Sequence, residues 1–329
     1  MIFRRPCFPL LFCGAMTFTA AAADLRIGMI GLDTSHAVEF TRRLNDPNDK
    51  NFIPGTRVVV ALKGGSPDIA QSSEHVDGYA KTVGEKLGVK IVGSIDELLK
   101  EADVVMVESI DGRPHLQEAL PVIRAHKPIF IDKPVAGSLR DAIEIYRAAK
   151  ENHVPIFSGS CLRYSVNLRQ MKEAGAGVIK GASSCGPCEL EPHHPDLFWY
   201  GIHPAEALYT IMGTGCQTVA CTATADTHLV TGVWNDGKVG TLRGLRNGAD
   251  PYRVTVFGSK KVLERELDVD YTPFLREVVK FFQTGVAPVP PEETLEIYAF
   301  LEAADESKRQ GGCPVKISDV LRKNGGPLN

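Results

Sequence analysis

The chain has 329 residues, of which 43% are hydrophobic and 23% are charged, and its formal net charge at pH 7 is −3. These values are typical of a globular protein and exclude a disordered or fibrous chain, and the length suffices for two domains with separate cores. An acidic chain without a basic cluster is not typical of proteins that bind nucleic acid, so we expect no nucleic-acid partner.

The N-terminus predicts export. Arg4 and Arg5 precede a mostly apolar stretch over residues 6–20, and three alanines at 21–23 provide the small residues that suit cleavage. We therefore predict a signal peptide over residues 1–23 and a periplasmic or secreted mature protein. The apolar stretch is short for a membrane span and no later segment is long enough, so we expect no membrane span.

Residues 24–159 alternate short apolar runs with amphipathic helices. Two helix starts carry capping pairs, Ser94 with Glu97 and Ser138 with Asp141. This alternation predicts a Rossmann-like, doubly wound parallel sheet in an α/β domain over 24–159. The expected strands are Leu25–Ile30, Arg57–Leu62, Val89–Val92, Asp103–Glu108, Pro128–Ile131 and Pro155–Ser158.

Residues 160–329 have a different pattern, with longer irregular stretches and paired strands. Val230–Trp234 and Val239–Arg243 flank a turn signal, Tyr252–Gly258 is a further expected strand, and helices are expected over Thr272–Thr284 and Glu292–Gln310. We predict an α+β domain with an open, mainly antiparallel sheet and helices on one face.

The first strand runs into Gly28-Met29-Ile30-Gly31-Leu32-Asp33-Thr34-Ser35-His36, the position where a dinucleotide fold binds diphosphate on backbone amides and a helix N-terminus. Only the first glycine of the G-x-G-x-x-G pattern, Gly31, is present. Asp33 and His36 replace the other two, and a carboxylate would repel a diphosphate. We expect Ser35 to cap the helix and to hydrogen-bond a phosphate.

The second strand ends at Lys63-Gly64-Gly65, without the acidic residue that usually holds an adenosine ribose. Lys63 would instead favour a 2′-phosphate. Two interpretations remain open: the cleft binds a nucleotide, or the fold is a relict whose cleft serves another ligand.

The fifth strand ends in Asp132-Lys133-Pro134. Ligands of parallel sheets bind beyond the carboxyl ends of the strands, so Lys133 is placed for chemistry, and burial beside Asp132 would tune its ammonium toward proton transfer. The alternative is a surface lysine in a loop.

His203 stands where a helix begins, with Pro204 after it and Glu206 in the first turn. The positive end of a helix favours the neutral imidazole, which is a base. The alternative is a simple helix cap in which Glu206 is the capping partner.

The loop over residues 191–200 collects polar and aromatic groups, as carbohydrate sites do. His193 or Asp196 would serve there as an acid or base, although the aromatic residues would equally suit a plug between domains. The residues predicted to bind substrate are Arg163, Tyr164, His194, Trp199 and Tyr200.

The element order, Asp132-Lys133-Pro134 (usually Glu-Lys-Pro), His115 ahead of it, and Gly201-Ile202-His203 together resemble the Gfo/Idh/MocA oxidoreductase family over nearly the whole mature chain. In that family the matching lysine and histidine line the substrate site beside the nicotinamide, which assigns catalysis to Lys133 and His203. This chain departs from the family's D-x-G-x-H segment, because Trp199 replaces its aspartate.

The resemblance implies NAD or NADP as cofactor, a carbohydrate substrate, and a homodimer or homotetramer formed through the open sheet. We expect no metal. The cofactor-binding residues would then be Gly28, Gly31, Leu32, Asp33, Thr34, Ser35, His36, Lys63, Ser109, His115 and Asp132.

The predicted function is an NAD(P)-dependent oxidoreductase acting on a sugar or sugar derivative. Because free nicotinamide cofactor is scarce outside the cytoplasm, an exported enzyme would hold it tightly and recycle it, for example during oxidation-assisted cleavage of a glycoside. The alternatives are a nucleotide-independent lyase, epimerase or hydrolase, and a non-catalytic sugar-binding protein.

Cys185-Gly186-Pro187-Cys188 has the letters of a thiol–disulfide exchange motif, but its flanks suggest a strand or loop rather than a helix start. The two cysteines could also join His193 and His194 in a zinc site. A local disulfide or free thiols is the simpler prediction.

Overall fold

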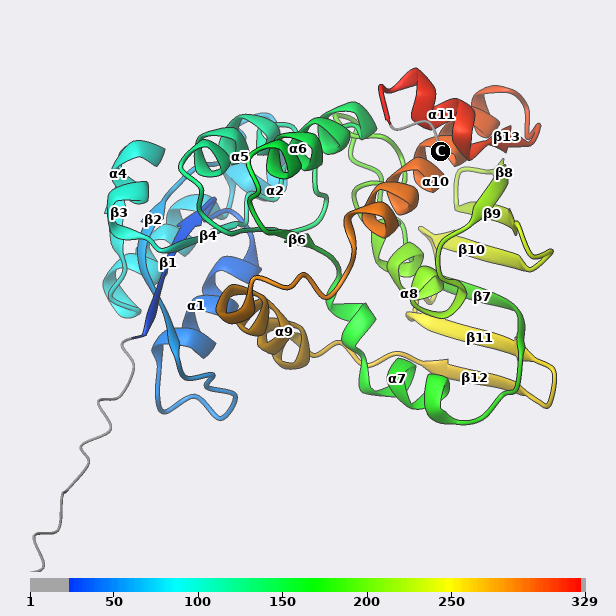
Figure 1. Cartoon of the computed structure of the whole chain (residues 1–329), viewed down its shortest axis with the longest axis horizontal. Coiled ribbons are helices and arrows are strands. Elements are labelled where there is room, and N and C mark those ends of the chain that lie inside the picture. The colour runs from blue at the N-terminus through cyan, green and yellow to red at the C-terminus, as the bar shows by residue number, and fades with distance from the viewer. Residues whose placement is uncertain (1–23, 327–329) are drawn as a thin grey trace, which may run out of the picture.

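A computed structural model describes residues 24–326, so the predicted signal peptide lies outside the described residues. Two sheets dominate the molecule (Figure 1). The first has six parallel strands in the order β3-β2-β1-β4-β5-β6, which confirms the doubly wound α/β prediction. Its strands are β1 (Leu25–Ile30), β2 (Thr56–Leu62), β3 (Lys90–Val92), β4 (Val104–Val107), β5 (Ile129–Ile131) and β6 (Ile156–Ser158).

Helices cover both faces of this sheet. The capping pairs form as expected, because the Ser94 and Ser138 hydroxyls accept from the backbone N–H groups of Glu97 and Asp141. At the first helix the Thr34 hydroxyl caps by accepting from the His36 N–H, so the prediction that Ser35 is the cap is wrong by one residue. The helices are α1 (Ser35–Asn45), α2 (Ala70–Ser73), α3 (Val76–Lys81), the π-helix η1 (Thr82–Lys86), α4 (Ile95–Glu101), α5 (His115–Arg124) and α6 (Leu139–Glu151).

The second sheet has seven strands in the order β12-β11-β7-β10-β9-β8-β13, and only the β7–β10 pair is parallel. The expected hairpin forms as β9 and β10, and the mainly antiparallel α+β prediction is confirmed. The sequence did not single out β8, β12 or β13. The strands are β7 (Ile179–Pro187), β8 (Cys216–Ala223), β9 (Thr227–Trp234), β10 (Val239–Leu245), β11 (Arg253–Gly258), β12 (Val262–Glu266) and β13 (Val315–Lys316).

The remaining helices follow β6 along the chain. They are η2 (Cys161–Tyr164), α7 (Val166–Glu173), α8 (Ile202–Met212), α9 (Tyr271–Thr284), α10 (Pro291–Arg309) and α11 (Ile317–Lys323). In Figure 1, α10 runs from the first sheet's helices to the second sheet, and α9 returns to lie beside α1. Phe274 and Phe281 of α9 pack on Phe130 and Phe157 of the first sheet. The chain from the second half thus completes the core of the first domain.

Among the described residues, no helix is both long and apolar enough to cross a lipid bilayer.

Candidate functional site

Lys133 follows β5 at the carboxyl edge of the parallel sheet, and only 9% of its surface is exposed. Its Nζ lies 5.2 Å from the centre of the Tyr200 ring, within the range of a cation–π contact. Tyr200 belongs to the loop before α8, so the lysine points across the junction of the two domains. The surface-lysine alternative is therefore wrong.

His203 lies in the first turn of α8 and is buried, with Nδ1 2.7 Å from the Ser160 Oγ. Burial holds the pKa of His203 well below its usual range, and the charges of Lys133 and His36 lower it further. The imidazole is therefore neutral at neutral pH. The helix-cap alternative is wrong, because Gly201 is the N-cap and the Glu206 carboxylate pairs with Arg163.

The Tyr200 and Tyr252 rings flank His203, with ring centres 5.8 and 5.9 Å from that of the imidazole. The structure thus places a lysine, a neutral histidine and two tyrosines at one point of the sheet edge. This arrangement has the proton acceptor, the cation and the aromatic faces that chemistry on a sugar hydroxyl requires.

Asp132 and His36 form a partly buried hydrogen-bonded pair in which the Asp132 Oδ2 lies 2.7 Å from the His36 Nδ1. The other ring nitrogen, Nε2, is 3.2 Å from the Tyr271 hydroxyl. Burial opposes ionisation of Asp132, but the charge and hydrogen bond of His36, together with Lys133, outweigh it and keep the Asp132 pKa below its usual value. His36 therefore contacts a carboxylate where the dinucleotide pattern has a glycine.

Glu108 is a member of this site that the sequence analysis missed. It follows β4, is fully buried, and neither carboxylate oxygen has a hydrogen-bond partner among the described residues. Burial raises its pKa well above the usual value, the Asp132 charge adds to this shift, and Lys133 opposes it. Its sequence pattern is the one that singles out Lys133, because Glu108 is also a charged residue at the end of an apolar strand.

The turn after β1 keeps one requirement of a dinucleotide fold. Gly31 has φ 87°, and a Cβ there would lie 2.3 Å from the Ser109 backbone nitrogen. Asp33 turns its carboxyl into the protein, where it accepts from the Ile110 N–H at 3.0 Å and the Ser72 hydroxyl at 2.6 Å. Burial raises the Asp33 pKa, although these two hydrogen bonds oppose the shift.

A hollow of about 350 Å³ lies beyond the ends of β2 and β4. Beside it, Lys63 forms an exposed ion pair with Asp77, and the Ser109 hydroxyl donates to Glu118. A larger hollow of about 1210 Å³ is lined by residues of α6, α10 and α11 and by none of the predicted site residues. The small hollow is lined by Gly64, Gly65, Ser66, Ser109, Asp111, Arg113, Pro114, Gln117 and Glu118.

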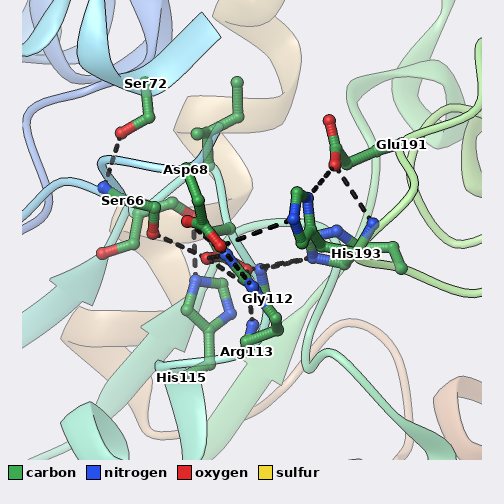
Figure 2. A network of polar contacts seen from close by, with 12 residues as sticks. Ser66, Asp68, Ser72, Gly112, Arg113, His115, Glu191 and His193 are labelled. Carbon is green, nitrogen blue, oxygen red and sulfur yellow. Dashed lines mark hydrogen bonds and ion pairs between the residues drawn. The ribbon is translucent and has the colours of Figure 1, made fainter. Parts of the chain in front are cut away.

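The loop over residues 191–200 is tied to the rim of this hollow (Figure 2). His193 reaches Asp68 and Glu191, and Asp68 in turn pairs with Arg113. His194 accepts from the Gly112 N–H at 3.1 Å through Nε2. His193 and His194 therefore fasten the loop to the first domain rather than joining Lys133.

Trp199 is buried against the ring of His194 and packs with Ile69 and Ile110. Trp199 therefore matches the alternative expectation that aromatic residues of this loop fill the junction between the domains. Tyr200, the next residue, is the one that turns toward Lys133.

Asp196 lies in a separate polar cluster. Its carboxylate contacts His228 and Lys308, and its backbone N–H donates to Asp305. Nothing in these contacts brings it to Lys133 or His203.

The Arg163 guanidinium forms buried ion pairs with Glu206 and Glu293. The Tyr164 ring packs on Phe274, with ring centres 5.6 Å apart. Both side chains are therefore engaged in packing contacts within the protein. His115 lies buried with its two ring nitrogens on the carbonyls of Val135 and Ser109.

Cys185 lies in β7 and Cys188 is buried just after it, and both are free thiols. Among the described residues, the side-chain groups that could hold a metal do not include these cysteines with His193 or His194. The zinc-site interpretation is therefore not supported by the geometry.

Residues 25–160 match the family described as "Oxidoreductase family, NAD-binding Rossmann fold". Over these residues the chain is similar to the Gfo/Idh/MocA oxidoreductase family. It is 35% identical over 107 residues to the 1,5-anhydro-D-fructose reductase of Ensifer adhaerens, covering 32% of this chain and 31% of that protein. It is 26% identical over 204 residues to the myo-inositol 2-dehydrogenase of Thermotoga maritima, covering 54% and 61%.

In both cases the match spans less than two thirds of the relative's own length. The fold is also that of the crystal structure of myo-inositol 2-dehydrogenase from Lactobacillus plantarum. That comparison has a TM-score of 0.73 and 16% identity, and it covers 89% of this chain and 99% of the other.

Whether this chain fits a nicotinamide dinucleotide depends on three parts of the crevice. The hollow beside Gly64 and Gly65 suits an adenosine, and the Lys133–His203 end suits a nicotinamide and substrate. Between them, the Asp33 carboxyl is buried and accepts hydrogen bonds from the Ile110 N–H and the Ser72 hydroxyl, and burial raises its pKa. The residues at the two ends of the crevice therefore fit a nicotinamide dinucleotide, and the middle of the crevice, at Asp33, tolerates it.

Proposed function

We propose that the protein is an NAD- or NADP-dependent oxidoreductase acting on a hydroxyl of a sugar, polyol or sugar derivative. The observation that carries the proposal is the buried Lys133 and neutral His203 at the carboxyl edge of the parallel sheet. Similarity to this family and relatives named for an anhydrofructose and an inositol support the substrate class.

Proton transfer is assigned to His203. In the tautomer that carries its proton on Nδ1 and donates to the Ser160 Oγ, the Nε2 of His203 is free to take the hydroxyl proton. Lys133 would hold the hydroxyl oxygen and stabilise the negative charge that develops on it. When bound, the nicotinamide ring would accept a hydride from the carbon that carries this hydroxyl.

The other residues along the crevice would bind the remaining parts of the cofactor and the sugar. Gly31 and the start of α1 would hold the diphosphate, and Gly64 and Gly65 the adenosine. Lys63 would favour NADP if it exchanged its exposed partner Asp77 for a 2′-phosphate. Tyr200 and Tyr252 would stack on the sugar.

Because residues 1–23 are predicted to be a signal peptide, we also propose that the cofactor is recycled within the enzyme. In an exported enzyme the nucleotide would be held tightly and returned to its starting redox state within each turnover. Oxidation of a glycoside, loss of its aglycone and re-reduction of the sugar form one such cycle. Fractionation of cells that produce the full-length chain, with the mature N-terminus sequenced, tests the export step.

Assembly is proposed to use the open sheet. Large apolar side chains are exposed on both sides of β7 in this sheet: Val239 on β10 and Val233 on β9 to one side, and Phe257 on β11 and Val262 on β12 to the other. Such a face needs a cover, and a second copy of the chain would supply it. Light scattering of the mature protein measures the state directly, and a monomer at micromolar concentration would contradict the proposal.

A nucleotide-independent lyase, epimerase or hydrolase is the second candidate. It is favoured by the Asp33 carboxyl, which links the turn after β1 to Ile110 after β4 and to Ser72, so that the loops around the diphosphate position are joined to one another. In that case Lys133 and His203 would act directly on an acidic carbon of the substrate.

One experiment separates the two candidates. The mature protein, purified without added nucleotide, is denatured, and released NAD(H) or NADP(H) is measured by absorbance and mass. Nucleotide near one equivalent per chain supports the oxidoreductase. Empty protein that also binds neither nucleotide when each is added favours the second candidate.

A further inference from the structure

Three elements of the first domain deliver ligand-type side chains to one buried point. His36 comes from the first turn of α1, Glu108 from the end of β4 and Asp132 from the end of β5. One ring nitrogen of His36 and one carboxylate oxygen of each acid lie within 4.8 Å of one another. Glu108 is fully buried and Asp132 is 3% exposed.

Glu108 lacks a partner for either oxygen among the described residues, although it is aimed into this cluster. A buried carboxylate is costly unless it is paired, protonated or bound to a metal. Lys133 stands next to Asp132, and its Nζ lies over the Tyr200 ring. Glu108 therefore needs a proton or a directly bound cation.

We propose that His36, Glu108 and Asp132 bind a divalent transition-metal ion of the zinc or manganese type. One imidazole with two carboxylates suits such ions better than calcium or magnesium, which prefer oxygen ligands alone. Three protein ligands leave coordination positions for water or for an oxygen of the substrate.

The surroundings of His36 match this role. Its Nδ1 already points at the Asp132 carboxylate, and its Nε2 lies 3.2 Å from the Tyr271 hydroxyl. Metal-bound imidazoles commonly donate their second N–H to such an outer group, which fixes the ring. Tyr271 and Phe40 also pack against the ring at 4.8 and 5.2 Å between centres.

The second acidic group of the molecule provides a matched comparison. Asp196, His228 and Asp305 also lie within 4.8 Å of one another, but Lys308 already contacts the Asp196 carboxylate. Because an ammonium already contacts a carboxylate of that cluster directly, we expect no metal there.

The test uses the mature protein, purified without chelator, with metal measured by inductively coupled plasma mass spectrometry. The protein is then stripped with EDTA and titrated calorimetrically with ZnCl₂ and with MnCl₂. We expect about one ion per chain, Glu108→Gln to weaken binding at least tenfold, and Asp305→Asn to leave it unchanged. Circular dichroism melting curves establish that both variants fold.

Stripped protein that binds neither ion would overturn the proposal, as would Glu108→Gln that binds as well as the wild type. In that event the buried acid carries a proton, and Glu108→Gln should be at least as stable as the wild type without metal. The inference does not rest on the oxidoreductase, because metal and nucleotide are counted separately in the same preparation.

Discussion

The Lys133 ammonium lies over the ring of Tyr200, 5.2 Å from its centre, and these two residues come from different domains. The lysine is positioned by a strand of the parallel sheet, and the tyrosine by a loop that His193 and His194 fasten to the rim of the crevice. The reactive end of the site thus depends on how the second domain is docked.

His203→Gln should lower kcat by about 10²–10⁴ on whichever sugar or polyol the wild type turns over, because glutamine cannot accept the hydroxyl proton. Substrate affinity should change much less. Steady-state kinetics on the purified variant gives both parameters. An unchanged kcat would show that another group is the base.

Lys133→Met should also reduce kcat, through loss of charge stabilisation at the hydroxyl oxygen, by roughly tenfold to a thousandfold. Tyr200→Leu is the companion variant, since it keeps the lysine and removes the ring over which its charge lies. We expect it to raise KM more than it lowers kcat. The opposite pattern would mean that Tyr200 acts in the chemical step rather than in binding.

The sequence predicted those parts of the fold that depend on local patterns, and the same kind of pattern singled out two candidate site residues. Apolar runs between capped helices gave the parallel sheet, and a charged residue at the end of such a run gave Lys133. His203 followed from its place at a helix start. The turn over 235–238 gave the hairpin of β9 and β10.

The sequence could not predict partners that are brought together from distant positions. His36 and Asp132 lie 96 residues apart, and their contact depends on how α1 and β5 sit on the sheet. Arg163 was likewise predicted from its residue type to bind substrate. Its charge is instead paired with Glu206 and Glu293 inside the protein. The edge strands β12 and β13 also form through pairing with a neighbouring strand. With only two residues, β13 is too short to have a sequence pattern of its own.

Asp33→Gly restores the second glycine of the dinucleotide pattern, and we expect it to tighten NAD or NADP binding at least tenfold at pH 8. The reason is that it removes a carboxyl from the diphosphate position and frees the Ile110 N–H. Asp33→Asn is the control, because it keeps the hydrogen-bonding shape without the charge. Fluorescence titration measures the dissociation constants. Equal affinities in all three proteins would show that the diphosphate does not approach residue 33.

Gly31→Ala should destabilise the protein by at least about 2 kcal/mol or prevent folding, because the added Cβ would lie 2.3 Å from the Ser109 nitrogen in a backbone with φ 87°. Gly237→Ala is the matched control. Gly237 has a similar φ of 81°, and nothing lies within 4 Å of its added Cβ. That variant should lose only about 1 kcal/mol. Urea denaturation compares them, and equal losses would mean that the loop after β4 moves away freely.

Asp305 makes stability depend on pH. Burial, together with the charges of Asp196 and Glu302, raises the pKa of this carboxyl from 3.8 to about 7, and its Oδ1 has no partner among the described residues. Between these two values the unfolded chain loses the proton while the folded protein keeps it, so this group's contribution to stability falls as pH rises from about 4 to about 7.

Asp305→Asn cannot ionise, and its amide oxygen can still accept from the Asp196 N–H. We therefore expect the variant to gain on the order of a few kcal/mol relative to the wild type at pH 8 compared with pH 4. Urea denaturation of both proteins across this range provides the measurement, and a difference that is constant with pH would show that Asp305 is ionised in the folded protein.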